Sequence, residues 1–157
     1  MSVRLARLAL VTTIVVARAS GAQTPAAPAL DTVPSAAWFD QSEVMIPMRD
    51  GVALHTFVFV PKGIATDLPF ILARTPYGIA GTGGVFASSY AELAREGYIF
   101  VFQDTRGRFK SEGQFEMLRS QRDKRDPAAI DEATDTFDTI EWMLHHVPHN
   151  NGRVGQL

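Results

Sequence analysis

Two short apolar segments with a helix-like segment between them most constrain the fold of this chain. The first, residues 69–74, contains Phe70-Ile71-Leu72-Ala73, and the second runs from Tyr98 to Phe102. Neither alternates between apolar and polar residues, which is typical of strands covered on both faces. Parallel neighbours of this kind are joined by right-handed crossovers that place helices on the sheet. The pattern therefore predicts an α/β fold with a parallel sheet.

A hairpin precedes these strands. Val44, Ile46 and Met48 lie at alternate positions, the turn signal Asp50-Gly51 follows, and a β-rich run extends over residues 52–60. Asp-Gly between two such runs is a strong hairpin signal. We expect an antiparallel pair of strands before the parallel ones.

Two helices are expected between and after the apolar strands. Ser89 and Glu92 have the spacing of a capping box, and Gly97 is suited to the left-handed residue that follows a helix. A second helix is predicted by an apolar stripe at helical spacing: Ile130, Ala133, Phe137, Ile140 and Leu144.

The second helix carries acids in its first half and histidines near its end. Negative charge at a helix start complements the helix dipole, so we interpret the acids as structural rather than as paired catalytic carboxylates: Asp131, Glu132, Asp135 and Asp138. Pro148 and residues 150–152 end the helix, and a fifth strand is expected to open at Arg153-Val154-Gly155.

The first residues resemble an export signal. Arg4 and Arg7 precede an apolar run over residues 8–16, and small residues lead to a cleavage site expected after Ala22. That run is shorter than the roughly 20 residues that span a bilayer, so no membrane anchor is expected after cleavage. We predict a signal peptide over 1–22, a flexible linker over 23–40 and a folded domain over 41–157. The chain has no cysteine, so neither disulfides nor a lipid-anchored cysteine is expected. With the export signal, this predicts a soluble protein in the periplasm or outside the cell.

Composition and motifs argue against several classes of ligand. The net charge is −2 and the sequence has no basic runs, so it offers no basic patch for binding nucleic acid. The glycines at 78, 81, 83 and 84 match no phosphate-binding motif, so we expect a mobile loop over the C-terminal edge of the sheet and rank a nucleotide-binding domain as the weakest alternative. His145, His146 and His149 lack metal-ligand spacing and are interpreted as helix-end residues, whereas His55 is expected at an edge or surface. No cofactor and no metal are predicted.

Several short sequence motifs, taken in their order and spacing, are more specific for a protein family than the order of predicted strands and helices. They are IPMRDGV at 46–52, RTPY at 74–77, GYIFVFQDTRG at 97–107, SEG at 111–113, and the segments 131–142 and 150–155. On these motifs the chain resembles the Xaa-Pro dipeptidyl-peptidase, cocaine-esterase and α-amino-acid ester hydrolase group, the CocE/NonD-type α/β hydrolases. The resemblance implies the N-terminal half of an α/β-hydrolase fold, truncated at the strand before the nucleophile elbow.

The resemblance also implies a site. The family's serine follows the fifth strand on a sharp turn, so the catalytic Ser, Asp and His are expected beyond residue 157 and this chain alone is expected to be inactive. Tyr77 matches the tyrosine whose phenol donates a hydrogen bond to the oxyanion, and a phenol keeps its proton at neutral pH. Separately from the resemblance, residues 104–107 leave the fourth strand at the active-site edge of the sheet, and we expect Asp104 and Arg106 to form a structural pair that shapes the pocket.

The function implied is that of a secreted serine hydrolase acting through an acyl-enzyme on acyl amino-acid esters, amides or Xaa-Pro peptides. Its partner would be a small ester or amide or a short peptide. A non-catalytic secreted fragment or binding module is the alternative. Because the fifth strand is central in the complete fold, the isolated chain is expected to be sticky or loosely packed.

Overall fold

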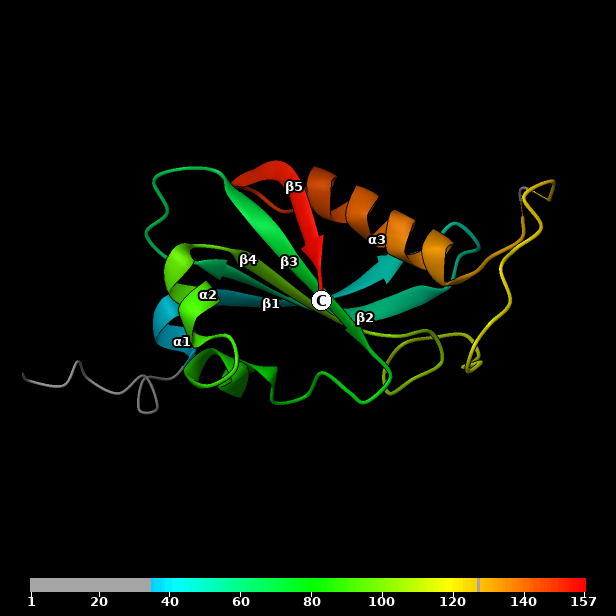
Figure 1. Ribbon diagram of the computed structural model, residues 1–157, viewed down its shortest axis with the longest axis horizontal. Helices are drawn as coiled ribbons and strands as arrows, with labels where there is room; N and C mark the ends of the chain where they lie inside the picture. The colour runs from blue at the N-terminus through cyan, green and yellow to red at the C-terminus, as the bar shows by residue number, and fades with distance from the viewer. Residues whose placement is uncertain (1–34, 127) are drawn as a thin grey trace, which may run out of the picture.

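The computed structural model describes residues 35–126 and 128–157, which form a five-stranded sheet in the order β1-β2-β4-β3-β5 (Figure 1). The strands are β1 (Phe39–Pro47), β2 (Ala53–Pro61), β3 (Leu68–Thr75), β4 (Ile99–Asp104) and β5 (Asn150–Gln156). The helices are α1 (Ser35–Trp38), the 3₁₀ helix η2 (Thr82–Ala87), α2 (Ala91–Glu96) and α3 (Glu132–His146). No helix in these described residues is long and apolar enough to cross a membrane.

The strand directions confirm the expected change from a hairpin to a parallel sheet. β1 and β2 are antiparallel and joined by a turn in which Gly51 has φ 86°. β2 is also antiparallel to β4, whereas β3 is parallel to both β4 and β5. β4, all of whose residues are buried, is a central strand as predicted.

The expected signal peptide lies outside the described residues, as does the expected linker up to residue 34. Residues 35–40, which the sequence assigned to the linker, form α1 and the start of β1. The Phe39 ring is only 2% exposed and stacks on Phe86 at 4.4 Å between ring centroids. The packed structure therefore begins before the expected boundary, because this ring completes an aromatic core.

Both faces of the sheet are covered by helices, α3 on one and α1, η2 and α2 on the other (Figure 1). On the α3 face, four buried aliphatic side chains of the strands and Phe70 pack against Met143 and Val147. On the opposite face, the core is aromatic and also includes Ile79 and Phe86 of the glycine-rich segment. Alternate residues of β3 serve the two faces: Phe70 and Leu72 contribute to the first, Ile71 to the second.

The expected details of the two helices are partly wrong. α2 begins after Tyr90 with no side-chain cap, so Ser89 and Glu92 form no capping box, but it ends at Gly97 with φ 85° as expected. The capping box belongs instead to α3, where Asp131 and Thr134 exchange hydrogen bonds. The expected stripe of α3 is confirmed only in part: Ile140 and Leu144 pack against the core, whereas Ala133 and Phe137 are exposed. Four other helix residues are buried: Thr134, Asp135, Thr139 and Met143.

Candidate active site

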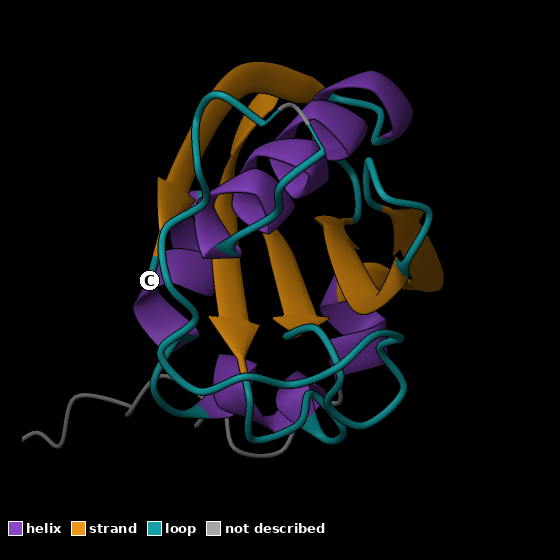
Figure 2. Ribbon diagram, turned by 90° about the vertical axis from the view of Figure 1, so that its right-hand side faces the viewer, coloured by secondary structure: helices purple, strands orange, loops and turns teal. Residues whose placement is uncertain are grey.

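Tyr77 lies at the C-terminal edge of the parallel strands. β3 ends at Thr75, which is the register partner of Asp104 at the end of β4. β5 runs in the same direction, with Gln156 opposite Leu72, and loops gather beyond the arrowheads of the central strands (Figure 2). The Tyr77 side chain is 86% exposed at this edge. The structure therefore places the phenol where loops of parallel α/β sheets bind ligands.

The loop that carries Tyr77 is held by the last residue of β4 and by the segment that follows this strand. The Thr105 amide donates to the Thr75 carbonyl at 3.0 Å. Arg108 Nε donates to the Pro76 carbonyl at 2.9 Å, and the Ile79 amide donates to Asp104 Oδ1 at 3.1 Å. Hydrogen bonds on both sides thus fix the main chain around an exposed ring.

Gly78 lets this loop approach the same segment closely. It has φ 96°, and a Cβ added there would lie 2.8 Å from Cζ of Phe109. Both the left-handed conformation and the aromatic contact disfavour a side chain at this position. The glycine-rich segment is therefore anchored at its beginning, where Ile79 is fully buried.

His55 is buried at the centre of a polar cluster, so its expected place at an edge or surface is wrong. β2 lies inside the sheet, and His55 is 3% exposed. Its Nδ1 lies 2.8 Å from Asp104 Oδ2 and its Nε2 lies 2.8 Å from Glu43 Oε1. The hydrogen bond from Lys110 Nζ, followed by that from His55, lowers the pKa of the Glu43 carboxyl.

Ser111, His55 and Asp104 lie together but do not form a catalytic triad. Ser111 Oγ accepts from the His55 amide at 2.8 Å and donates to the Asp104 carbonyl at 2.7 Å. Both ring nitrogens of His55 already face carboxylates, so neither is free to deprotonate a hydroxyl. The cluster cross-links β2 to the end of β4.

Arg106 does not pair with Asp104, contrary to expectation. Its Nη2 donates to Asp135 Oδ1 at 2.6 Å and its Nη1 to Asp50 Oδ2 at 2.7 Å. The hydrogen bonds to Asp135 are the main cause of the raised pKa of Arg106. Because Asp104 is occupied by His55 and Ile79, Arg106 instead fastens α3 and the hairpin turn to the segment after β4.

Arg74 makes a second link between α3 and the strand ends. Its Nε donates to Gln103 Oε1 at 2.8 Å and its Nη1 to Thr136 Oγ1 at 2.7 Å. Burial lowers the pKa of Arg74, an effect opposed by the charges of Glu132 and Asp135. The acids of α3 thus do more than complement the helix dipole, because they receive buried guanidinium groups.

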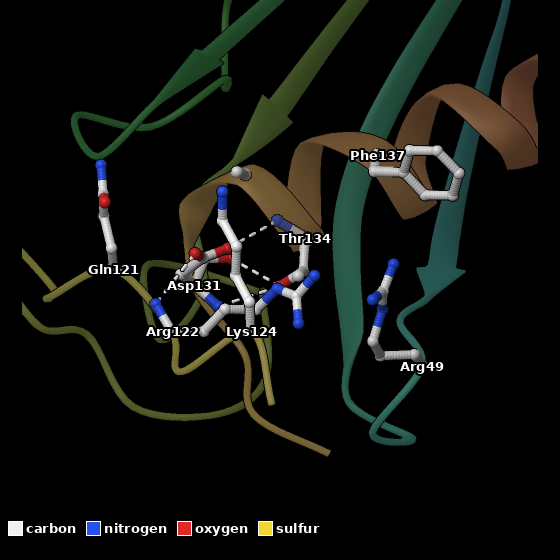
Figure 3. A pocket seen from close by; sticks show the side chains of 8 residues that line it. Arg49, Gln121, Arg122, Lys124, Asp131, Thr134 and Phe137 are labelled. Atoms are coloured by element: carbon white, nitrogen blue, oxygen red, sulfur yellow. Dashed lines mark hydrogen bonds between the residues drawn. The ribbon is translucent and has the colours of Figure 1, made fainter. Parts of the chain in front are cut away.

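A hollow of about 560 Å³ lies beside the start of α3 (Figure 3). Its lining includes Arg49, Arg122, Lys124 and the exposed ring of Phe137. Asp131 accepts hydrogen bonds there from the amides of Arg122 and Thr134, so the helix start is already capped. None of the residues that line the hollow belongs to the loop that carries Tyr77, so the hollow is separate from the predicted oxyanion donor, the Tyr77 phenol.

The described part of the chain holds no group of three or more side chains suited to bind a metal ion. His145 and His146 turn Nδ1 to the carbonyl oxygens of Glu141 and Trp142, at 2.7 and 2.8 Å. These contacts within the last turn of α3 agree with their interpretation as helix-end residues.

Comparisons with known proteins relate this arrangement to hydrolases. Residues 50–157 match the X-Pro dipeptidyl-peptidase (S15) family. Cocaine esterase of Rhodococcus sp. (strain MB1 Bresler) is 37% identical over 121 residues, which make up 74% of this chain and 18% of that protein.

Two solved structures share the fold at comparable identity. An aminopeptidase from the marine sediment archaeon Thaumarchaeota archaeon matches with a TM-score of 0.68 and 33% identity over 90% of this chain and 24% of its own. An α-amino acid ester hydrolase matches with a TM-score of 0.67 and 38% identity over 92% of this chain and 24% of its own. The expected partial α/β-hydrolase fold is thereby confirmed, and the chain spans about a fifth to a quarter of each relative's length.

Proposed function

Because the chain belongs to the X-Pro dipeptidyl-peptidase (S15) family, we propose that it is the N-terminal part of a secreted serine hydrolase. The proposed substrates are acyl amino-acid esters, amides or Xaa-Pro peptides, cleaved through an acyl-enzyme. The observation that carries the proposal is the exposed Tyr77 on a fixed loop at the C-terminal edge of β3.

Tyr77 would stabilise negative charge on the substrate. When a serine attacks the acyl carbon, its proton passes to a general base and the carbonyl oxygen becomes an oxyanion. The phenol hydroxyl would donate to that oxygen, and a backbone amide would supply the second donor. Collapse of the intermediate expels the protonated leaving group, and water then releases the acyl group from the serine.

The direction of β5 supports this role. β5 is parallel to β3 and next to it, so a serine on a sharp turn after β5 would emerge at the edge where Tyr77 lies. The general base and its carboxylate would also come from parts of the whole protein beyond residue 157. We therefore propose that residues 1–157 alone have no hydrolase activity.

We also propose that the protein is exported to the periplasm or the exterior. The charged, apolar and small-residue regions of residues 1–22 support this location.

The full-length gene product provides the test of the enzymatic proposal. A fluorophosphonate probe is expected to label it, whereas the 157-residue chain should remain unlabelled. Tyr77→Phe removes one oxyanion donor and should lower kcat for p-nitrophenyl acetate by roughly 10²- to 10³-fold while labelling persists.

Tyr98→Phe is the matched control. Tyr98 comes just before β4, at the opposite end of that strand from the candidate site, and packs in the aromatic core. The control should leave kcat near that of the wild type. Equal kcat in both variants would reject the role of Tyr77, and an unlabelled, inactive full-length protein would favour a binding module instead.

A further inference from the structure

We infer that His55 is a positioning residue for Tyr77, acting through the carboxylate of Asp104. The inference rests on the proposed function for its effect on catalysis. Its structural basis is a continuous series of hydrogen bonds that starts in β1, passes through β2 and β4, and ends in the loop that carries the phenol.

Both oxygens of the Asp104 carboxylate are used in this series. Oδ2 faces His55 Nδ1 at 2.8 Å, and Oδ1 accepts the Ile79 amide at 3.1 Å. Asp104 is 1% exposed, so bulk water is not available to replace either partner. Without the His55 donor, the buried Asp104 carboxylate would lack a hydrogen-bond partner at Oδ2. If the carboxylate rotated to reach another donor, its hydrogen bond with the Ile79 amide would break.

The Ile79 amide lies two residues after Tyr77 and defines one end of its loop. The Ile79 side chain is fully buried in the aromatic core, and this packing holds residue 79 in place. The hydrogen bond to Asp104 ties this residue to the end of β4. Because Tyr77 itself is exposed, its position depends mainly on these main-chain anchors.

The orientation of the His55 ring is in turn set by residues on the side of the ring away from Asp104. Glu43 Oε1 faces Nε2 at 2.8 Å and also receives Lys110 Nζ at 2.6 Å. The ring of Phe57 lies edge-on to the imidazole, with centroids 5.1 Å apart. These contacts hold Nδ1 toward Asp104.

Two substitutions of His55 in the full-length protein distinguish the roles of its two ring nitrogens. Asn carries its amide near the position of Nδ1, whereas Gln reaches the position of Nε2. His55→Asn should keep the donor to Asp104 and retain kcat within about threefold of the wild type. His55→Gln should lose that donor and lower kcat by about tenfold with little change in KM, a fraction of the effect of losing the whole oxyanion donor.

Ser111→Ala is the matched control, because Ser111 is buried in the same cluster and also links β2 to Asp104 but does not contact the Asp104 carboxylate. Each substitution is combined with Tyr77→Phe. If His55 acts through the phenol, His55→Gln should cost little further kcat in the Tyr77→Phe background, whereas any effect of Ser111→Ala should be the same in both backgrounds.

Hydrogen exchange of the Ile79 amide gives a readout that needs no activity. Exchange should accelerate in His55→Gln and remain slow in His55→Asn. Equal exchange in the two variants, or a full kcat loss on top of Tyr77→Phe, would overturn the inference. An inactive wild-type protein with the expected Ile79 difference would instead reject the proposed function while leaving the His55 link in place.

Discussion

Asp135 and Asp138 lie three positions apart on α3, and their ion pairs differ in burial. The Asp135 and Arg106 side chains are 1% and 3% exposed, whereas those of Asp138 and Arg49 are 11% and 33% exposed. Removing one member of a buried pair leaves an uncompensated charge, which costs about 3–5 kcal/mol. A pair with access to water contributes about 1 kcal/mol or less.

We therefore predict that Asp135→Ala lowers the free energy of opening of α3 by about 3 kcal/mol, with Asp50 still bound to Arg106. Asp138→Ala, the matched change on the same helix, should cost about 1 kcal/mol. Hydrogen exchange of the α3 amides in the full-length protein measures both. Similar losses in the two variants would show that burial does not distinguish these pairs.

At this scale the sequence could identify Tyr77 as a candidate but not the partners of the buried charges. Arg106 binds residues 56 and 29 positions away, and Asp104 binds His55 at a separation of 49. Such pairings are decided by which strands become neighbours. The proximity of Asp104 and Arg106 in the chain suggested a pair that the strand order does not form.

At the scale of elements, the start of α3 depends on Asp131. Its carboxylate accepts from the amides of Arg122 and Thr134, and these hydrogen bonds, in that order, lower its pKa. Loss of such a cap typically costs about 1 kcal/mol. We predict that Asp131→Ala lowers the urea midpoint of the full-length protein, whereas Asp131→Asn, which retains a capping oxygen, changes it less.

The lowered pKa of Asp131 also predicts a pH effect. Because the folded state binds this proton less readily than the unfolded chain, the carboxylate stabilises the fold fully above the ordinary aspartate pKa, about 4. That stabilisation is lost as the pH falls through the lower folded value. From pH 7 to pH 3, urea titrations should therefore show a larger loss for the wild type than for Asp131→Asn. An identical loss in both proteins would contradict this linkage.

The existence of α3 and the packing of Ile140 and Leu144 could be predicted from its periodicity, but the polar part of its buried face could not. Arg74 and Gln103 reach the α3 side of the sheet from the ends of β3 and β4, and they bind Thr136 and Thr139 of the helix. These buried polar groups require polar partners, so part of the helix face toward the sheet is polar. Phe137 instead lies 56% exposed, with the Arg49 guanidinium 5.7 Å from its ring centroid.

At the scale of the whole molecule, the hairpin and the parallel strands could be predicted because their signals are local. The order β1-β2-β4-β3-β5 places β5 at one edge of the sheet, paired with β3 alone among the described strands. Five of its seven residues are exposed. Large apolar side chains are exposed as well, among them Phe109, Met117, Leu118 and Leu157.

These features predict that residues 23–157, produced alone, associate or remain loosely packed. An unpaired strand edge templates pairing with another chain, and exposed apolar side chains promote association. Analytical ultracentrifugation should show mass rising with concentration, and the fragment should bind a hydrophobic dye more strongly, per unit mass, than the full-length protein. Replacing Met117 and Leu118 together by Lys should reduce dye binding without abolishing association through β5. A monomer that melts sharply and reversibly would show that this half of the fold is stable without a neighbour for β5.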